Sequence, residues 1–453
     1  MNAIRRADTL VADRLRQAAA RESLPDPGPA ATAAEAAAAI SVHSPHADRF
    51  RAETAAAVSG TALALEAARP HPADLWAHAT AAHTDPTVWF EQAVALGHPT
   101  HPLARSRGSL TEPQIRAWAP EHRARIDLGL HRTRGLRADE EWPARDQAGP
   151  LLPVHPWQSR CHGLPEPAAT WPQAAPLMSL RTVSTGRWHV KCAVDLQLTS
   201  AVRHVSPAAI HNGPVLSAML AGPADRAGIT LLPETAAAAH GPAGPRPDLA
   251  AIIRPAPHTL TGGRCVPLAA LAEPCPATGR PIGAALAGEH LDLWWGLLAE
   301  AAAAPLRLFT DTGVALEAHG QNTLVAFDAA GRPTGLVYRD LGGIRVPATG
   351  WPPLEGRIAC DDADERARKL TAALYPTALS ALVTALAEWT GTDPGRWWRP
   401  LAAAARPAAA PSPVLTAAVF GTTWPIKATT AMRLADDPLA DLWARIDNPL
   451  AEP

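Results

Sequence analysis

Two short apolar runs separated by a turn form the clearest pattern of hydrophobic and polar positions in the chain. Thr323–Phe327 and Gly335–Tyr338 are rich in β-prone residues, and the segment 328–334 between them contains Asp, Gly and Pro. This arrangement predicts a β-hairpin. Asn322 precedes the first run and Asp340 follows the second, so antiparallel pairing would bring the amide and the carboxylate close together.

The same patterns divide the remaining chain into three parts, which predict an α+β protein. Residues 1–150 are mostly helical and begin with an amphipathic segment at residues 1–24. Residues 151–290 change to shorter β-prone runs, and residues 291–453 return to helical periodicity around the hairpin. Residues 402–413 are Ala-rich with three prolines and indicate a loose connector. The strands expected in the middle part are Ser179–Val183, Trp188–Leu198 and Ala250–Arg254.

Composition narrows the class of protein. A length of 453 residues indicates about three domains. Lys plus Arg (41) against Asp plus Glu (43) gives a net charge of −2, which provides no strong field for nucleic acid or a membrane surface. The N-terminus lacks a signal-peptide core, no run of about eighteen apolar residues is expected, and the five cysteines are scattered. We therefore expect a soluble, cytoplasmic protein.

A basic, Pro-rich segment at residues 97–108 is the first candidate site. Its two His-Pro dipeptides contain His98 and His101, with Thr100 between them and Arg105 after them. Proline favours extended conformations in the residue before it, so we expect both histidine side chains to project from the chain. Arginine forks and protonated histidines suit a polyanionic small molecule. A metal site and a Pro-rich loop with incidental basic residues are the alternative interpretations.

A second basic cluster falls on a predicted hairpin in the middle part of the chain. Ser179, Arg181 and Thr182 lie before a Ser-Thr-Gly turn, and Lys191 and Arg203 follow it. Three cations on neighbouring strands resemble a phosphate clamp built without a Gly-rich loop. Lysine and arginine on strands are also common as solvated edge residues, so this interpretation depends on the other clusters.

Polar residues gather at the open end of the first hairpin. Glu317, His319 and Gln321 precede Asn322, and Asp340 follows the second strand. Hard oxygen ligands suit Mg²⁺ bound to a nucleoside triphosphate, because Mg²⁺ takes one or two protein oxygens plus phosphates. The alternative is a surface hairpin with a polar loop. The motifs GxxxxGK[ST], GxGxxG, GxSxG and HExxH are absent from the sequence, which argues against P-loop NTPases, Rossmann dehydrogenases, α/β-hydrolases and zincins.

Taken in order, these segments resemble the NRPS-independent siderophore (NIS) synthetases of the aerobactin-synthetase-like IucA/IucC type. The resemblance extends from about residue 90 to the C-terminus, and each block is modest alone but stands in the family's order. The matching blocks are Gly97–Pro102, Trp118–Glu121, Val154–Gln158, Ser179–Thr182, Lys191, Thr199–Arg203, His211–Gly213, Glu317–Asn322, Arg339–Asp340, Lys427–Leu434 and Asn448–Leu450.

The resemblance implies a thumb–fingers–palm architecture and an ATP-dependent ligation. Residues 1–150 would form a helical thumb with the acid-binding loop, 151–290 the β-rich fingers with the phosphate clamp, and 291–453 the helical palm with the catalytic and metal hairpin. Members adenylate a carboxylic acid, often citrate or a dicarboxylic monoamide, with loss of pyrophosphate. An amine or hydroxyl then displaces AMP. The implied cofactors are ATP and Mg²⁺, and homodimers are common in the family.

The candidate residues fit that chemistry in groups, because adenylation depends on cations that position the triphosphate and the acid. The triphosphate would be bound by Ser179, Arg181, Thr182 and Lys191, with His319 at the α-phosphate and Gln321 beside it. Mg²⁺ would be held by Glu317, Asn322 and Asp340. The acid would be bound by His98, Thr100, His101 and Arg105, with Arg203 between acid and phosphate. The expected catalytic residues are Lys191, Arg203 and His319.

Two departures and two rival functions accompany the resemblance. The chain is shorter than most members, and Arg105 stands where the family usually has Lys, which keeps the charge but changes its geometry. A small-molecule kinase is the strongest rival, but kinases place an Asp base where this chain has Gln321. A binding protein with a decayed synthetase fold is the other rival.

Overall fold

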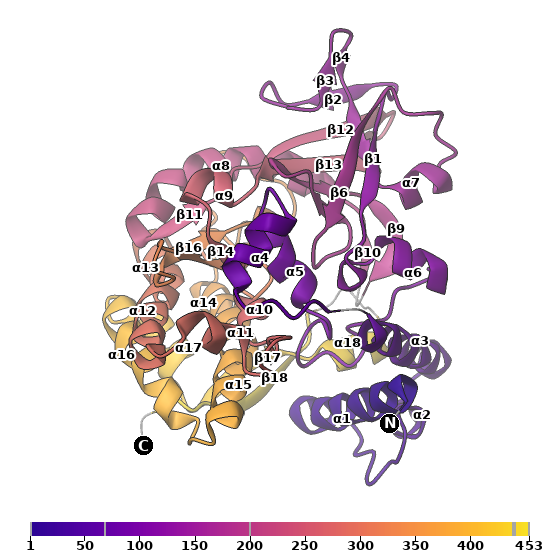
Figure 1. The fold of residues 1–453 in the computed structure, drawn as a ribbon. Helices are drawn as coiled ribbons and strands as arrows, with labels where there is room; N and C mark the ends of the chain where they lie inside the picture. The colour runs from indigo at the N-terminus through magenta and orange to yellow at the C-terminus, as the bar shows by residue number, and fades with distance from the viewer. Residues whose placement is uncertain (1, 68, 199–200, 437–440, 452–453) are drawn as a thin grey trace.

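Helices form the front and back of the chain and strands its middle, so the predicted α+β class is confirmed (Figure 1). The computed structural model describes residues 2–67, 69–198, 201–436 and 441–451. The large hydrophobic cores among these residues lie in the N-terminal helices, around the main sheet and in the C-terminal half. Figure 1 shows the first three helices at the lower right, the main sheet above them and the C-terminal helices to the left.

The N-terminal helices pack around a small apolar core, and the predicted amphipathic first helix is confirmed. Val11, Leu15 and Phe50 are buried in this core, and Leu103 joins them from the His-Pro segment. The segment that should approach a substrate is thereby attached to the helices. The helices of this part are α1 (Ala3–Glu22), α2 (Ala33–Ile40), α3 (Ala47–Glu66), α4 (Leu75–Ala82), α5 (Thr87–Ala93), α6 (Glu112–Trp118) and the 3₁₀ turn η1 (Pro120–His122).

An eight-stranded antiparallel sheet occupies the middle of the chain, in the order β2-β12-β13-β8-β7-β6-β1-β5. The expectation of helices up to residue 150 is wrong beyond His122, because the sheet begins at Ile126. Ile126, Leu128 and Leu130 are buried at every second position, which is the period of a strand. The strands are β1 (Ile126–His131), β2 (Leu136–Ala138), β5 (Leu152–Val154), β6 (Ala169–Pro176), β7 (Thr182–Ser184), β8 (Trp188–Cys192), β12 (Thr235–Gly241) and β13 (Gly244–Pro255). The pairs outside this sheet are β3 (Arg145–Asp146) with β4 (Gly149–Pro150) and β9 (Val194–Leu198) with β10 (Ala201–Arg203).

A 21-residue helix, α8 (Pro207–Ala227), interrupts the strands of the middle part, and the sequence pattern does not predict it. Ser206 caps this helix, and Pro207 occupies its first turn, where proline is tolerated. Pro214 and Pro223 lie inside the helix and obscure its pattern, because proline normally removes a helical hydrogen bond. The short helices of this part are α7 (Pro156–Cys161) and α9 (His258–Thr261).

The predicted hairpin is confirmed and forms the centre of a four-stranded sheet. Its strands pair antiparallel with Thr323 opposite Tyr338, and Arg339 N donates to Asn322 O at 3.1 Å. This pairing brings the segments that carry Asn322 and Asp340 to one end of the sheet, as the sequence predicts. The strands, in sheet order, are β11 (Ile229–Leu231), β16 (Pro333–Tyr338), β15 (Thr323–Phe327) and β14 (Cys265–Pro267).

Helices cover this smaller sheet and complete the C-terminal half. The connector expected at residues 402–413 is wrong, because α16 continues to Ala409 through Pro400 and Pro407, and alanine has the strongest helix propensity. The remaining elements are α10 (Leu268–Leu271), α11 (Ile282–Ala287), α12 (Leu291–Ala302), α13 (Ala304–Thr312), η2 (Leu341–Gly343), α14 (Ala363–Ala373), the π-helical η3 (Leu374–Leu379), α15 (Ser380–Thr390), α16 (Gly395–Ala409), α17 (Pro413–Phe420), β17 (Thr423–Lys427), α18 (Thr429–Leu434) and β18 (Trp443–Asp447).

One continuous helical stretch of the described residues, Ala363–Thr390, contains an 18-residue window with a mean hydropathy of 1.6, so it is long and apolar enough to cross a membrane by length and composition. The expectation that the chain has no such run is therefore wrong. In this structure 67% of the apolar window is buried inside the protein. A helix that is apolar and mostly buried is typical of the core of a large soluble protein.

Candidate functional site

An ion pair between the two sheets forms the centre of the site. Lys191, on β8, places its Nζ 2.7 Å from both carboxylate oxygens of Asp340, which follows β16. Burial alone would raise the pKa of Asp340, but Lys191 and Arg254 hold that pKa well below its usual range. Burial lowers the pKa of Lys191, and Asp340 opposes this shift. The fold thus joins two clusters that are separate in the sequence.

The backbone around Asp340 is held in an unusual conformation. Asp340 has a φ of +75°, in the left-handed region that residues other than glycine seldom adopt. The hydroxyl of the buried Tyr338 accepts from Glu317 N at 3.1 Å and donates to Asp340 O at 3.4 Å. Tyr338 therefore links the backbones that carry the two carboxylates. Sequence reasoning missed this role, since Tyr338 appears there only as a strand residue.

The predicted phosphate-clamp residues are brought together by the β7–β8 pairing. Thr182 lies opposite Lys191 in that pair, and Ser179 Oγ accepts from Thr182 N at 3.2 Å. Arg181 Nη1 donates to the carbonyl oxygens of Arg203 and of the next residue, at 2.9 and 2.7 Å. Burial, with a contribution from Arg203, lowers the pKa of Arg181 to about 10, so its guanidinium is charged at neutral pH.

Arg203 lies at the end of β10. Its Nε donates to Leu198 O at 3.0 Å. Burial lowers the pKa of Arg203, while the charges of Asp340 and Glu317 oppose the shift. The charge of Arg203 therefore interacts electrostatically with the carboxylates of the hairpin region. Thr199 and Ser200, which belong to the matching block, lie outside the described residues.

The loop before β15 turns tightly around His319. His319 N donates to Glu317 O at 2.8 Å, and Asn322 N donates to His319 O at 3.0 Å. Gln321 N donates to His319 Nδ1 at 3.3 Å, so the neutral ring carries its proton on Nε2. Burial lowers the pKa of His319, which favours this neutral form. The ring therefore offers one N–H donor to the pocket that it lines.

The predicted magnesium ligands suit a hard cation by donor type alone, since both carboxylate oxygens of Asp340 already accept from Lys191. Glu317 and Asp340 supply carboxylates, and Asn322 supplies an amide oxygen, which are the ligand types that Mg²⁺ prefers. A Cβ on Gly343 would lie 1.9 Å from Glu317 Oε2, so glycine at this position leaves room for the carboxylate. Within the described part of the chain, no group of three or more His, Cys, Asp or Glu side chains could hold a metal.

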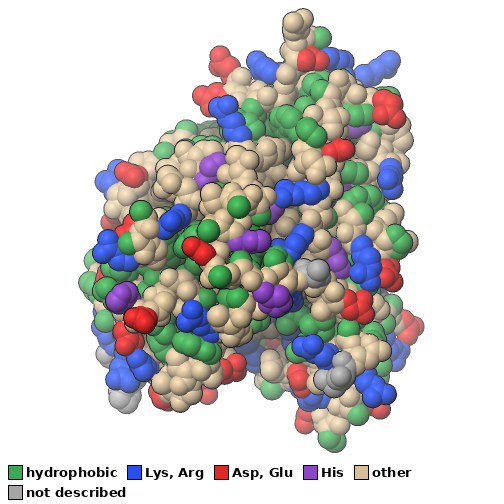
Figure 2. Space-filling view, in the orientation of Figure 1, with side chains coloured by type: hydrophobic (Ala, Val, Ile, Leu, Met, Phe, Trp, Pro, Cys, Tyr) green, Lys and Arg blue, Asp and Glu red, His purple; other side chains and the backbone are tan. Residues whose placement is uncertain are grey.

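A pocket of about 110 Å³ opens beside His319, between the N-terminal helices and the C-terminal half. The predicted residues His98, Thr100, Glu317 and His319 all line it. Figure 2 shows histidine, lysine and arginine side chains gathered across the middle of this face of the molecule. Sequence reasoning missed further lining residues, which include Arg21, Glu22, Lys369, Lys427 and Trp443.

Lys369 is the most buried cation of this pocket. Its Nζ lies 3.7 Å from Glu317 Oε1, and its side chain is 7% exposed. Burial lowers the pKa of Lys369, and Glu317 opposes that shift. Glu22, by contrast, accepts from the backbone N–H groups of Thr430 and Ala431 at 2.9 and 2.8 Å, at the start of α18. Glu22 is therefore engaged in holding a helix terminus.

The His-Pro segment differs from its prediction in the exposure of one histidine and in the charge of both, since desolvation by the surrounding protein and the neighbouring His101 lower the pKa of His98 to about 3 as well. His98 is exposed, and its Nδ1 lies 3.3 Å from Thr100 Oγ1. His101 is buried, and its Nδ1 accepts from Leu103 N at 3.0 Å. Burial and nearby arginines lower the pKa of His101 to about 3. The expectation of a projecting, protonated histidine is therefore wrong for His101, because its ring is enclosed beside cations.

Arg105 does not reach the pocket, which corrects its predicted role in acid binding. Its guanidinium donates to Ala95 O at 2.6 Å and to Val94 O, and lies 3.5 Å from Glu121. The side chain is 2% exposed and is occupied by these acceptors. The change from Lys to Arg thus yields a buried structural contact, since a five-donor fork satisfies several carbonyl oxygens at once.

A buried Glu–Arg pair next to the clamp was also missed. Arg254 Nη1 donates to Glu234 Oε1 at 3.1 Å, and Glu234 Oε2 finds no partner among the residues that the structure describes. Burial raises the pKa of Glu234, and the charge of Asp340 adds to this. A single Arg at the end of an apolar strand gives no sequence signal for such a pair.

Comparison with known sequences matches two families to successive parts of the chain. The IucA / IucC family matches residues 86–137 and 132–273. The family described as ferric iron reductase FhuF-like transporter matches residues 292–441. The first match covers the large sheet with the clamp, and the second covers the hairpin and the helices that follow it.

Relatives and solved structures agree with the first match. Staphyloferrin A synthase of Staphylococcus aureus is 29% identical over 323 residues, which are 58% of this chain and 54% of that protein. The rhizobactin siderophore biosynthesis protein RhbC of Rhizobium meliloti is 28% identical over 56% of this chain and 54% of its own length. The chain thus spans about half the length of these relatives.

The fold matches that of aerobactin synthetase. The ATP-bound aerobactin synthetase IucA of Klebsiella pneumoniae aligns with a TM-score of 0.73 and 19% identity, covering 89% of this chain and 83% of that one. The petrobactin biosynthesis protein AsbB of Bacillus anthracis gives the same TM-score and identity, covering 89% of this chain and 79% of its own. Over residues 86–273 the chain is thus similar to the IucA/IucC family, and its fold is that of these siderophore synthetase structures.

Proposed function

We propose that this protein is an ATP-dependent ligase of siderophore or related biosynthesis. It adenylates a carboxylic acid, citrate or a related di- or tricarboxylate, and joins it to an amine or hydroxyl with release of AMP and pyrophosphate. The observation that carries the proposal is the Lys191–Asp340 contact, which joins the clamp on the large sheet to the hairpin loop. We also propose that the protein is located in the cytoplasm, as the sequence predicts.

The buried cations supply the electrostatic part of the reaction. A carboxylate is a poor electrophile, and its attack on the α-phosphorus brings negative charges together. Arg181 and Lys191 would bind the triphosphate, with Ser179 and Thr182 as hydroxyl donors. Preorganised donors in a site of low dielectric stabilise developing charge without reorganisation at the moment of reaction. Arg203, whose pKa is raised by the charges of Asp340 and Glu317 against the effect of burial, would bind both the acid and the α-phosphate.

His319 and the hairpin carboxylates complete the proposed arrangement. Neutral His319 would donate from Nε2 to the α-phosphate or to the acyl oxygen, since its Nδ1 is occupied by Gln321 N. Glu317, Asn322 and Asp340 are the residues that would hold Mg²⁺. When bound, this ion would neutralise the charge of the triphosphate.

The acid is proposed to enter the pocket beside His319. His98 and Thr100 would donate or accept hydrogen bonds there, and Lys369 would pair with a second carboxylate of the acid. Lys369 already has one carboxylate partner, Glu317 at 3.7 Å, but its ammonium group has three donors, so a carboxylate of the acid can pair with it as well.

Product analysis tests the proposal. Purified protein with Mg²⁺ and ATP should release pyrophosphate only when a competent acid is added, and hydroxylamine should trap the adenylate as a hydroxamate. The acids to screen are citrate, succinyl-hydroxamate acids, α-ketoglutarate and amino-dicarboxylates. Formation of ADP and inorganic phosphate would overturn the ligase proposal in favour of a kinase. Tight Mg·ATP binding without turnover across this screen would favour a binding protein.

A further inference from the structure

Helix α5 (Thr87–Ala93) is an unusual element, because its short span carries buried polar side chains. Thr87, Glu91 and Gln92 are all buried, in company with Trp89 and Phe90. The helix packs against β6 of the large sheet and against β14 of the small one. Figure 1 shows α5 at the centre of the molecule, between the region of the large sheet and the C-terminal helices. It therefore contacts both of the parts that meet at the candidate site.

Glu91 touches both halves of the site through their backbone neighbours. One oxygen of its carboxylate pairs with the guanidinium of Arg339, the residue directly before Asp340. The other oxygen accepts from Met178 N at 3.0 Å, directly before Ser179. The Glu91 side chain is 0% exposed, and that of Arg339 is 3% exposed. A single carboxylate thus bridges the hairpin loop and the start of the clamp turn.

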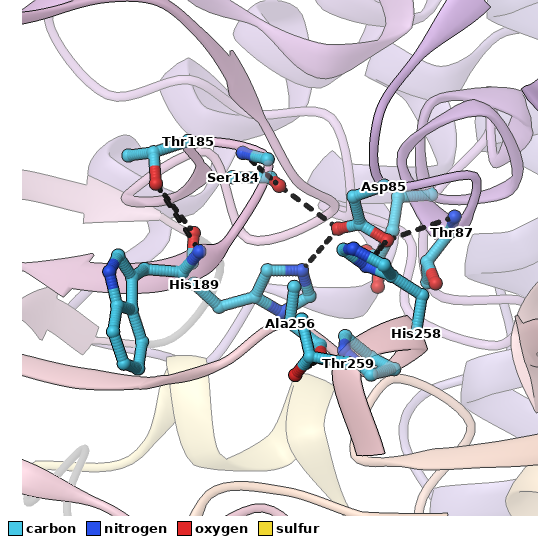
Figure 3. Close-up of polar contacts among 12 residues, drawn as sticks. Asp85, Thr87, Ser184, Thr185, His189, Ala256, His258 and Thr259 are labelled. Carbon is cyan, nitrogen blue, oxygen red and sulfur yellow. Dashed lines mark hydrogen bonds and ion pairs between the residues drawn. The ribbon is translucent and has the colours of Figure 1, made fainter. Parts of the chain in front are cut away.

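Asp85, just before α5, makes a second set of contacts to the clamp strands. Ser184 Oγ donates to Asp85 Oδ2 at 2.9 Å, and His189 Nε2 lies 2.7 Å from the same oxygen (Figure 3). The carboxylate of Asp85 also accepts from Thr87 N at 3.2 Å and lies 3.5 Å from His258 Nδ1. Figure 3 shows these side chains converging on Asp85 from separate elements.

The strand geometry connects Asp85 to the clamp. Residues two apart on a strand project to the same face, so His189 shares its face of β8 with Lys191, and Ser184 shares its face of β7 with Thr182. Fixing His189 and Ser184 on Asp85 therefore fixes the direction in which Thr182 and Lys191 point. Among the described residues, Asp85, Ser184 and His189 are not part of the lining of the pocket beside His319.

We propose that Asp85 and Glu91 are positioning residues that brace the phosphate clamp against the hairpin loop. This inference rests on the proposed ATP-dependent function. Asp85 holds β7 and β8, and Glu91 holds Arg339 and Met178, so α5 sets the distance between the triphosphate residues and the carboxylates of the hairpin. Misplacement of reacting groups by about 1 Å can cost about 10²-fold in rate.

The bridging contact through Glu91 is sensitive because it is buried. Removing one partner of a buried ion pair leaves the other charge without compensation. Arg339 also donates to Gln321 O at 3.1 and 2.8 Å, so neutralising Glu91 would leave Arg339 bound to the His319 loop alone. The strained backbone of Asp340 then loses one of its supports, while Lys191 and Arg181 keep their own contacts.

The test uses Glu91→Gln in the chain of 453 residues, with two readouts. Calorimetry compares ATP binding with and without Mg²⁺, and pyrophosphate release gives kcat and the Mg²⁺ concentration for half activation. We expect Glu91→Gln to keep metal-free ATP binding within about threefold. The gain in ATP affinity from Mg²⁺ should fall about tenfold, and kcat should fall about 10²-fold. Glu91→Asp, which keeps the charge, should recover part of both losses.

Glu121→Gln is the matched control, because Glu121 forms a buried pair with Arg107 away from the clamp and the hairpin. It should lower the melting temperature to a similar extent and leave the Mg²⁺ effect on ATP affinity unchanged. Equal Mg²⁺ effects in Glu91→Gln and in the control would overturn the inference. Asp85→Asn is a second variant, should Glu91→Gln fail to fold, and the same calorimetric comparison decides it.

Failure of the proposed ligase function can be distinguished from failure of the proposed bracing role. Wild-type protein that binds Mg·ATP but releases no pyrophosphate with any acid contradicts the proposed function alone, and the calorimetric comparison still tests the bracing role. Wild-type protein that is active while both variants keep a normal Mg²⁺ response contradicts the bracing role alone.

Discussion

The clamp–hairpin junction and the pocket beside it are built in opposite ways. At the junction, Lys191 is buried, Asp340 and Arg181 are half-buried, and each already has charged or backbone partners. In the pocket, exposed His98 and the weakly paired Lys369 face open space, and the distance from Lys369 to Glu317 is 3.7 Å. The first region is preorganised, whereas the second keeps groups that a ligand can engage.

This difference matches two tasks of the proposed reaction: the junction would position the triphosphate for every acid, and the pocket would select the acid. Positioning a triphosphate requires charges that are fixed by their surroundings, because preorganised groups need no costly reorientation during the reaction. Choosing an acid requires side chains that gain a partner when the correct ligand binds. We therefore expect changes at the junction to reduce turnover for every acid, and changes in the pocket to alter the KM for the acid with little effect on ATP.

The largest expected effect lies at the junction, in Arg203. Arg203→Ala should lower kcat/KM by about 10²-fold or more, the scale of one preorganised donor. Arg203→Lys should recover only part of this loss, because the fork geometry is missing. Steady-state pyrophosphate release with each of two acids provides the measurement.

The Arg203 variants can also contradict the distinction between the junction and the pocket. If Arg203→Ala lowered activity for one acid and left the other near normal, Arg203 would belong to the selective region. Near-normal activity with both acids would remove Arg203 from the site altogether.

The junction was largely predictable because its signals are local. A turn between two apolar runs fixes the hairpin and its register, and the register alone brings Asn322 beside the segment of Asp340. Cations on the β7–β8 hairpin follow from the same reasoning. The contact between Lys191 and Asp340 depends on how the two sheets pack against each other. The family resemblance implied this contact, but the local sequence pattern alone could not predict it.

The pocket and its supports were not predictable, since they depend on contacts between distant elements. Lys369 and Arg21 lie on ordinary amphipathic helices, where a cation normally indicates a solvated face. Glu91 likewise looks like one polar residue of a short helix. Arg105 stood in a basic motif, yet the fold turns it toward backbone carbonyl oxygens. Burial, which decides each of these roles, has no residue-level signature in a single sequence.

The next largest effect should appear in the pocket, at Lys369. Lys369→Gln should raise the KM for the acid about tenfold or more, because a charge-assisted hydrogen bond to a carboxylate contributes about 1.5–3 kcal/mol. The Kd for ATP should stay within about twofold, and Lys369→Arg should be milder. Arg396→Gln, which removes an exposed charge outside the pocket, is the control. An equal loss of ATP affinity in Lys369→Gln would place Lys369 in the nucleotide site.

The smallest effect concerns His101, whose state the structure redefines. With a pKa of about 3 the buried ring is neutral at pH 7, so it can contribute only a neutral hydrogen bond, worth about 0.5–1.5 kcal/mol. His101→Ala should therefore raise the KM for the acid by about three- to tenfold and leave ATP binding unchanged. His155→Gln is the control, because His155 is also buried with a pKa of about 3 but lies at the start of α7, outside the His-Pro segment.

The pH dependence distinguishes a neutral His101 from a charged one. The unfolded chain binds a proton at His101 below about pH 6.5, whereas the folded chain does so only near pH 3, so folding stability should fall as pH drops through this window. Between pH 6 and 8 the ring stays neutral, and the KM for the acid should show no titration that His101→Ala removes. A KM that rises with pH in the wild type and is flat in His101→Ala would mean that acid binding protonates the ring. The His-Pro segment would then carry a charge switch, and the contrast with the fixed charges of the junction would become sharper.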